Sequence, residues 1–220
     1  MASSIQESKD ALVCVIDDDA DVRSAMDSLL RSVGYDVLTF ASPEDFLASD
    51  AVDDAACLML DIWLDGADGL DFQRTLAENA VKVPVVLMSG QGDIPMTVRG
   101  MKAGAVNFLI KPFTEEGVLA AVGEAVERDR RRRAETSLGD GIRTLYAKLT
   151  PRERDVMSLV TAGLMNKQIA GRLELSEVTV KIHRGNLMRK MNAQSLADLV
   201  RMAETLGVRE RSVTRYGATG

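Results

Sequence analysis

Long apolar runs are missing from this sequence, and so is a basic and apolar leader. No run approaches the roughly 18 consecutive apolar residues that a membrane-spanning helix needs. The first ten residues, MASSIQESKD, lack the charged and apolar regions of a secretory signal peptide. We therefore expect a protein that has no membrane partner and stays in the cytoplasm.

Cysteine and histidine are also scarce. The cysteines are Cys14 and Cys57, and each lies inside an apolar run of strand length. Buried reduced thiols are far more common at such positions than a disulfide or a metal pair. The single histidine, His183, lies at the edge of the apolar face of a predicted helix. We expect it to pack or hydrogen-bond inside a helical domain rather than to act in catalysis or metal binding.

Charge is unevenly distributed along the chain. Residues 150–220 hold 12 Lys and Arg against 7 Asp and Glu, whereas residues 1–149 hold 15 against 26. A basic segment can approach a polyanion, whereas an acidic segment repels it and can hold a cation. The chain has 220 residues, which is enough for two domains. We expect these two domains to have different partners.

The first half alternates short apolar segments with helical patterns. The expected strands are residues 12–16, 35–40, 56–60, 83–88 and 106–110, and the expected helices are residues 20–33, 43–48, 70–79, 94–103 and 115 onward. This alternation predicts an α/β fold, a doubly wound (βα)5 parallel sheet with helices on both faces. In such sheets, ligands bind beyond the carboxyl ends of the strands.

A linker is expected to follow this half. Residues 127–133 (ERDRRRR) are rich in arginine, which is typical of a solvated helix face, although contact with DNA phosphate is an alternative. Residues 137–141 (SLGDG) contain two glycines and predict a break in the helix. We expect residues 126–148 to form a helical linker.

The second half shows four short helical patterns and no strand pattern. Thr150-Pro151-Arg152-Glu153 is a capping box with proline at the first helical position, and it predicts a helix that ends near Gly163. Three more helices are expected to be capped by Asn166, Ser176 and Ser195 and to end at Glu174, at Met191 and before Gly207. The tight turn at Leu175 indicates a helix-turn-helix.

Polar side chains follow four of the five expected strands. They are Asp17, Asp18 and Asp19 after the first strand, Asp61 after the third, Ser89 after the fourth and Lys111 after the fifth. Clustered carboxylates raise one another's proton affinity, and Mg²⁺ is the usual remedy. One carboxylate can then attack phosphorus in line while the hydroxyl and the ammonium hold the phosphoryl oxygens. For Asp19, capping of the next helix is an equally good explanation.

Residues 11–125 resemble the receiver domain of two-component response regulators. The resemblance rests on residues 15–19 (VIDDD), 58–61 (LMLD), 89–90 (SG) and 108–113 (FLIKPF). It implies that Asp61 accepts a phosphoryl group from a sensor histidine kinase, and that Asp17, Asp18, Asp61 and the Trp63 carbonyl bind Mg²⁺. It also implies that Ser89 and Lys111 bind the phosphoryl oxygens. Phe108 would be the switch aromatic, which turns inward when Ser89 moves. The peptide bond between Lys111 and Pro112 would be cis.

The loop after Asp61 departs from the family pattern. Asp65 stands where relatives often have proline, which would loosen the loop, and Trp63 is bulky. The Trp63 side chain is expected either to shield the acyl phosphate from water or to be an ordinary exposed aromatic.

Residues 150–206 resemble the LuxR-type helix-turn-helix of the NarL/FixJ family, through residues 149–153 (LTPRE), 166–170 (NKQIA) and 179–183 (TVKIH). At 100° per residue, Val180, Leu187 and Met191 form the core face of the third helix. The opposite stripe is small or apolar and edged with cations, which suits a major groove. We expect Lys181, Ile182 and Gly185 to enter the groove, with Lys181 as the base reader, and Arg184, Arg189, Lys190 and Lys167 to contact phosphates.

These features predict a phosphorylation-dependent transcriptional regulator with a receiver over residues 11–125 and a DNA-binding domain over residues 149–207, flanked by tails 1–10 and 208–220. Phosphorylation is expected to change the face formed by residues 94–110, so that a homodimer forms and binds promoter DNA. No enzymatic role is expected beyond self-catalysed phosphoryl transfer and hydrolysis at Asp61. One alternative is a phosphoaspartyl phosphatase or phosphotransferase, but these often carry a second aspartate where Trp63 stands. Another is a DNA-binding protein with an unphosphorylated, ligand-responsive receiver, against which the acid pair, Ser89 and Lys111 argue.

Overall fold

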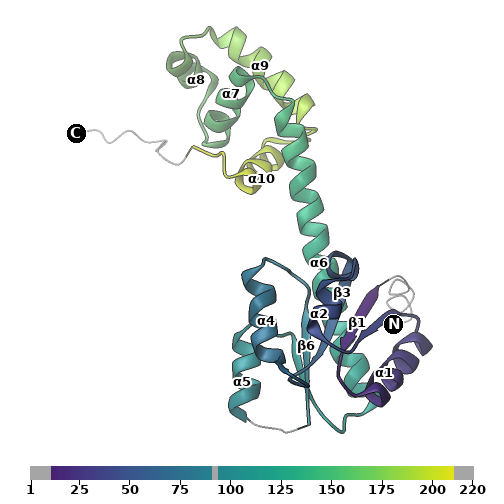
Figure 1. Ribbon diagram of the computed structural model, residues 1–220. Helices are drawn as coiled ribbons and strands as arrows, with labels where there is room; N and C mark the ends of the chain where they lie inside the picture. Colours follow the sequence, from purple (N-terminus) through teal and green to yellow (C-terminus); the bar gives the residue numbers. More distant parts are fainter. Residues whose placement is uncertain (1–10, 91–93, 211–220) are drawn as a thin grey trace. The chain divides into compact units, whose positions relative to one another are not determined.

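The computed structural model describes residues 11–90 and 94–210. The chain divides into two compact units between Arg133 and Ala134 (Figure 1). Each unit has its own apolar core. The predicted tail 1–10 and residues 211–220 of the predicted C-terminal tail lie outside the described residues. Within the described ranges, no helix has both the length and the apolar character needed to cross a membrane.

The first unit is built on a five-stranded parallel sheet with the strand order β2-β1-β3-β6-β7. The strands are β1 (Leu12–Ile16), β2 (Asp36–Phe40), β3 (Ala55–Asp61), β6 (Val85–Ser89) and β7 (Asn107–Ile110). All seven residues of the central strand β3 are buried. A strand that is buried throughout and apolar up to its last residue is typical of a parallel sheet covered on both faces. The doubly wound fold expected from the sequence is confirmed.

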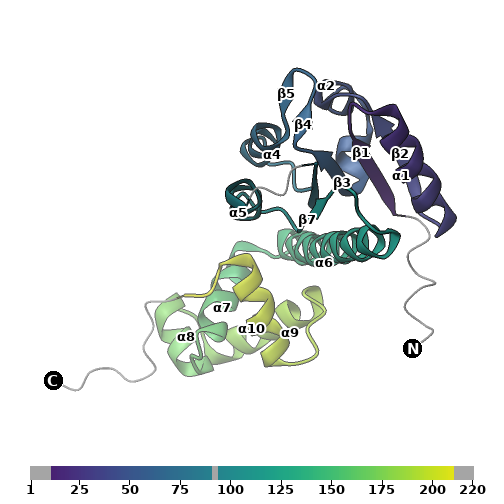
Figure 2. The ribbon, with the colours of Figure 1, turned by 90° about the horizontal axis from the view of Figure 1, so that it is seen from below.

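Helices cover both faces of this sheet (Figure 2). One face carries α1 (Ala20–Ser32) and the first half of α6, and the other carries α2 (Pro43–Leu47), α3 (Ala51–Asp54), α4 (Gly69–Glu78) and α5 (Ile94–Lys102). Asp19 is the N-cap of α1, because its carboxylate accepts a hydrogen bond from the backbone N–H of Asp21 at 2.8 Å. The capping explanation for Asp19 is therefore confirmed.

Three short elements were not anticipated from the sequence. The helix α3 has only four residues, and the strands β4 (Trp63–Leu64) and β5 (Ala67–Asp68) pair as a small antiparallel hairpin after β3. Elements of two to four residues are too short to show a hydrophobic period. Gly66 closes the hairpin with a φ of 84°, a left-handed conformation that glycine adopts without strain.

The long helix α6 (Glu115–Ala147) contains 33 residues, so the break predicted at residues 137–141 is wrong. The buried carboxylate of Asp129 is paired with the guanidinium groups of Arg132 and Arg133. Arg133 Nη2 also donates to the backbone carbonyls of residues 53, 54 and 55, at 3.0, 3.1 and 3.2 Å. These contacts hold α6 against the amino end of β3.

The second unit contains the end of α6 and four further helices: α7 (Pro151–Thr161), α8 (Asn166–Leu173), α9 (Glu177–Lys190) and α10 (Leu196–Leu206). Thr150 forms the predicted capping box, and the side chains of Ser176 and Ser195 cap α9 and α10 as expected. Asn166 was predicted as the cap of α8, but the N-cap is Met165. Asn166 is instead the first helical residue, and its side chain accepts a hydrogen bond from α9.

Candidate functional site

An acidic cluster lies at the carboxyl edge of the sheet in the first unit. One ligand atom from each of Asp17, Asp18 and Asp61 lies within 4.8 Å of the others. Asp17 and Asp61 are buried, whereas Asp18 is exposed, so the cluster is open to water on one side. Three carboxylate oxygens with room for waters are the ligand set that Mg²⁺ prefers. The residues present therefore fit a magnesium ion.

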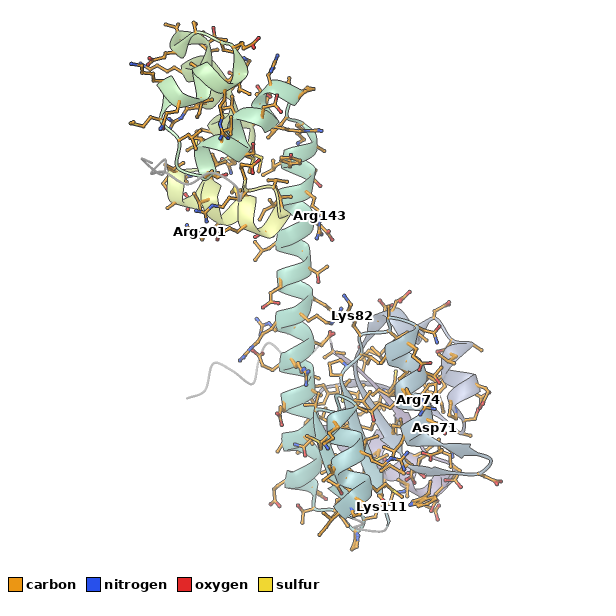
Figure 3. The ribbon with its side chains drawn as sticks, turned by 90° about the vertical axis from the view of Figure 1, so that its left-hand side faces the viewer. Asp71, Arg74, Lys82, Lys111, Arg143 and Arg201 are labelled. Atoms are coloured by element: carbon orange, nitrogen blue, oxygen red, sulfur yellow. The ribbon has the colours of Figure 1, made fainter. Side chains whose placement is uncertain are left out.

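Lys111 brings a positive charge into this cluster. Lys111, which is labelled in Figure 3, directly follows β7 in the chain. Its ammonium Nζ lies 2.7 Å from Asp17 Oδ2 and 2.6 Å from Asp61 Oδ2. Desolvation alone would lower the pKa of Lys111, but its hydrogen bonds to the two carboxylates raise the pKa above its ordinary value. Burial raises the pKa of Asp17, and the hydrogen bond from Lys111 opposes that shift. The amine is therefore held in its charged form beside Asp61.

The backbone places Asp61 at the open end of β3. The N–H of Ile62 donates to the carbonyl of Met88 on β6, and the N–H of Gly69 donates to the carbonyl of Ile62, both at 2.9 Å. A Cβ atom at position 69 would lie 2.2 Å from the backbone oxygen of Asp61, so only glycine fits there. Gly69 was not singled out from the sequence, because a close approach between α4 and the end of β3 leaves no local pattern.

Trp63 lies in the hairpin next to Asp61. Its backbone N–H donates to Asp61 Oδ1 at 3.1 Å, and the residue is 52% exposed. Both oxygens of Asp61 are therefore engaged, Oδ1 by the Trp63 amide and Oδ2 by Lys111. The arrangement fixes the orientation of the carboxylate.

Ser89 and Phe108 lie on the two strands next to β3. The register pairs Asp61 with Met88, so Ser89 comes one residue later at the end of β6. Ser89 is fully buried, and its carbonyl accepts a hydrogen bond from the backbone N–H of Lys111 at 2.7 Å. Phe108 is half-buried and packs against the core on the α4 side. The peptide bond between Lys111 and Pro112 is cis, as expected.

In the second unit, α9 has one buried face and one exposed face. Val180, Leu187 and Met191 are fully buried, which confirms the predicted core face. The exposed residues of α9 are Glu177 at its start and Val178, Lys181, Ile182, Gly185 and Arg189 on the other side. The side chains of Val178 and Ile182 are 70% and 58% exposed. Such exposure of apolar side chains on a helix that ends in cations is typical of a binding surface.

The cationic side chains of α8 and α9 differ in their exposure and in the partners that they already have. Lys181, Arg189 and Lys167 are exposed, and Arg189 Nη2 also donates to Asn186 Oδ1 of its own helix at 3.3 Å. Arg184 donates to Asn166 Oδ1 at 2.6 Å, which ties α9 to the start of α8. Lys190 Nζ lies 2.7 Å from Glu153 Oε2, so a phosphate contact by Lys190 would have to break this ion pair. His183 is half-buried in the same helix.

Glu153 was expected only to complete the capping box of α7. In the structure it is almost fully buried, and its Oε2 accepts hydrogen bonds from Thr150 N at 2.8 Å and from Lys190. Desolvation would raise the pKa of Glu153, but the hydrogen bonds from Lys190 and Thr150 outweigh it and lower the pKa. Glu153 thus links the start of α7 to the end of α9.

Comparisons with known proteins match both units. Residues 13–123 match the model of the response regulator receiver domain, and residues 147–203 match that of the bacterial regulatory proteins of the luxR family. Nodulation protein W of Bradyrhizobium diazoefficiens is 49% identical over 203 residues, which cover 92% of this chain and 89% of that protein. Response regulator protein TodT of Pseudomonas putida is 41% identical, over 89% and 86%. The structure of the response regulator StyR is similar with a TM-score of 0.79 and 44% identity, covering 89% of this chain and 98% of that one.

Proposed function

We propose that this chain, which belongs to the NarL/FixJ family of two-component response regulators, regulates transcription through phosphorylation of Asp61. The family expected from the sequence motifs is confirmed. The observation that supports Asp61 as the acceptor is its position between two acidic neighbours and the ammonium of Lys111, 2.6 Å away. We assign residues 11–125 to the receiver domain, residues 126–148 to a helical linker and residues 149–207 to the DNA-binding domain.

The acidic cluster would bind Mg²⁺ through Asp17, Asp18, Asp61 and the backbone carbonyl of Trp63. Once bound there, the ion supplies positive charge that neutralises the phosphoryl oxygens. Asp61 attacks phosphorus in line, so that an O–P bond forms as the N–P bond of a kinase phosphohistidine breaks. Lys111 and Ser89 hold the phosphoryl oxygens during transfer. The same site would catalyse the slow hydrolysis of the acyl phosphate by water.

The second unit is a LuxR-type DNA-binding domain, and we propose that α9 enters the major groove of double-stranded promoter DNA. Lys181, Ile182 and Gly185 lie on its exposed face and would meet base edges, with Ile182 able to contact a thymine methyl. Arg189 and Lys167 are exposed and are the best placed to contact phosphates. Arg184 and Lys190 would have to leave their present partners, Asn166 and Glu153, to do so.

Phosphorylation would act on the receiver through charge. It adds about -1.5 to -2 charge units beside existing carboxylates. Ser89 and Lys111 would move toward the new group, and Phe108 would turn into the space that Ser89 leaves. The face formed by α5 and β7 would change as a result. This face has exposed apolar side chains, since Ile94 is 76% and Ile110 is 52% exposed.

We propose that a homodimer forms through this face. A dimer would present two copies of α9 to half-sites about one helical turn apart, which multiplies weak single contacts. The phosphoryl donor would be a sensor histidine kinase. Because its target is promoter DNA, the protein would act in the cytoplasm of the bacterium.

The proposal is tested by labelling full-length protein with acetyl phosphate and selecting bound DNA sequences, for the wild type, Asp61→Asn and Asp65→Asn. Asp65 is an exposed aspartate in the same loop and serves as the matched control. We expect stoichiometric labelling and tighter DNA binding for the wild type and Asp65→Asn, and neither for Asp61→Asn. Continued turnover of a phosphomonoester would favour an enzyme instead. Equal DNA binding by a monomer with and without beryllofluoride would refute the switch.

A further inference from the structure

Arg23 reaches from α1 to the backbone of the loop that carries the acidic pair. Its Nη1 atom donates to the carbonyl oxygen of Asp17 at 2.7 Å and to that of Asp18 at 2.9 Å. Both acceptors are main-chain oxygens rather than carboxylates. Arg23 is half-buried on the second turn of a well-formed helix, so its guanidinium is attached to a rigid element. One side chain therefore bridges two successive peptide groups of the loop.

These two peptide groups flank the Cα atom of Asp18. A peptide group is planar, so the direction of its carbonyl fixes the plane on each side of that Cα. With both planes fixed, the direction in which the Asp18 side chain leaves the backbone is fixed as well. This matters because Asp18 is the exposed member of the cluster, whereas Asp17 and Asp61 are held by Lys111.

Asp17 has a separate support. Its Oδ1 accepts the backbone N–H of Asp19 at 3.0 Å, and its Oδ2 is paired with Lys111. Its backbone N–H donates to the carbonyl of Phe40 on β2 at 3.3 Å. Loss of Arg23 would therefore leave Asp17 supported. It would free mainly the peptide group between Asp17 and Asp18, because the hydrogen bond from Asp19 N to Asp17 Oδ1 also holds the peptide group between Asp18 and Asp19.

We propose that Arg23 is a positioning residue for the cation site, which holds the Asp18 carboxylate in the direction needed for Mg²⁺ to bind. This inference rests on the proposed function. A guanidinium also carries a charge that repels a divalent cation. Positioning of Asp18 and repulsion by the guanidinium charge change the Mg²⁺ affinity in opposite directions. If the charge dominated, removing Arg23 would tighten Mg²⁺ binding, whereas loss of positioning weakens it.

The test is a Mg²⁺ titration of full-length protein. The probe is the fluorescence of Trp63, which is the single tryptophan and donates its backbone N–H to Asp61. Isothermal titration calorimetry provides a second measurement. The variants are Arg23→Ala and Arg23→Gln, both of which remove the charge and the bridge. The matched control is Arg31→Ala, because Arg31 also lies on α1 and donates to a backbone carbonyl, that of Val37 on β2.

We expect Mg²⁺ affinity to fall by about 10- to 100-fold in both Arg23 variants, as is common when a residue that orients a metal ligand is removed. Arg31→Ala should bind Mg²⁺ as the wild type does. Thermal unfolding in EDTA is measured alongside, because a merely structural role would lower stability without changing affinity. If Arg23→Ala does not fold, Arg23→Gln decides alone.

Unchanged or tighter Mg²⁺ binding by a folded Arg23 variant would overturn the inference and leave the proposed function intact. If the wild type itself gave no saturable response to Mg²⁺ by either method, the proposed cation site would fail, and the role of Arg23 with it. The two failures are therefore distinguishable.

Discussion

Lys190→Met is expected to destabilise the second unit more than Glu153→Gln, although both changes break the same ion pair. The reason is a difference in burial. The side chain of Glu153 is 4% exposed and that of Lys190 is 30% exposed. Without its partner, Lys190 can be hydrated where it stands, whereas Glu153 would keep a buried negative charge.

The magnitudes follow from the contacts that remain. Removing one partner of a buried pair costs about 3–5 kcal/mol. In Lys190→Met the Glu153 carboxylate retains the hydrogen bond from Thr150 N at 2.8 Å, so we expect a loss near the lower limit, about 3 kcal/mol. In Glu153→Gln the amide oxygen can still accept that hydrogen bond, and only the charge-assisted part is lost, about 1–2 kcal/mol.

The two variants should also respond differently to pH. In the wild type the pKa of Glu153 is lowered below its ordinary value of 4.5. The ion pair therefore stabilises the fold fully above pH 4.5 and ceases to do so as the pH falls through the folded-state pKa. In Lys190→Met the lowering by Lys190 is lost, so this pKa should be higher than in the wild type. The stability gap between Lys190→Met and the wild type should therefore close as the pH falls.

Amide hydrogen exchange of full-length protein measures this effect, because a chain with two units does not unfold in a single step. The amides of α7 and α9 report on the second unit. Arg189→Met is the control, since Arg189 is exposed on the same helix. Its free energy of unfolding should lie within about 0.5 kcal/mol of the wild-type value. The reasoning is refuted if Lys190→Met leaves exchange unchanged but reduces the salt dependence of DNA binding, because Lys190 would then be a phosphate contact.

Three further perturbations test other parts of the structure. Gly69→Ala should displace the end of β3, lower the free energy of unfolding by about 1–3 kcal/mol and reduce labelling of Asp61. The control is Gly123→Ala, whose new Cβ meets nothing within 4 Å and which should cause none of these effects. Replacing both Gly139 and Gly141 by alanine should stabilise the last third of α6 by about 1 kcal/mol per site, seen as slower amide exchange there. Unchanged exchange would show that these glycines do not weaken the helix. Trp63→Ala should shorten the lifetime of the acyl phosphate if the indole excludes water, and an equal lifetime would end that idea.

The sequence was sufficient to predict the sheet and the acidic cluster because both arise from local patterns. Apolar segments of strand length located all five strands of the parallel sheet, although not the hairpin β4–β5. The polar residues that follow these strands had to meet at one edge of the sheet. Residues 17, 18, 61 and 111 do meet there.

Contacts between distant segments could not be predicted in the same way. Glu153 and Lys190 are 37 residues apart, and each has an adequate local explanation, as a capping residue and as a helix-terminal cation. The requirement for Gly69 likewise appears only when α4 is packed against the backbone of Asp61. Arg23 was not singled out from the sequence, because its two carbonyl acceptors are found only in the folded structure.

The wrong prediction for residues 137–141 has a different cause, because there the local pattern was sound and was outweighed. Glycine in a helix interior costs about 1 kcal/mol relative to alanine. A break would cost more, since the residues beyond it would have to nucleate a second helix. Packing favours continuity, because Val118, Ala121 and Val122 are anchored in the first core and Ile142 packs against the core of the second unit. Residues 134–138, between these two ends, are exposed. We therefore infer that residues 134–138 are helical because the two ends of α6 are packed against the two cores, and that local opening of the helix begins in this segment.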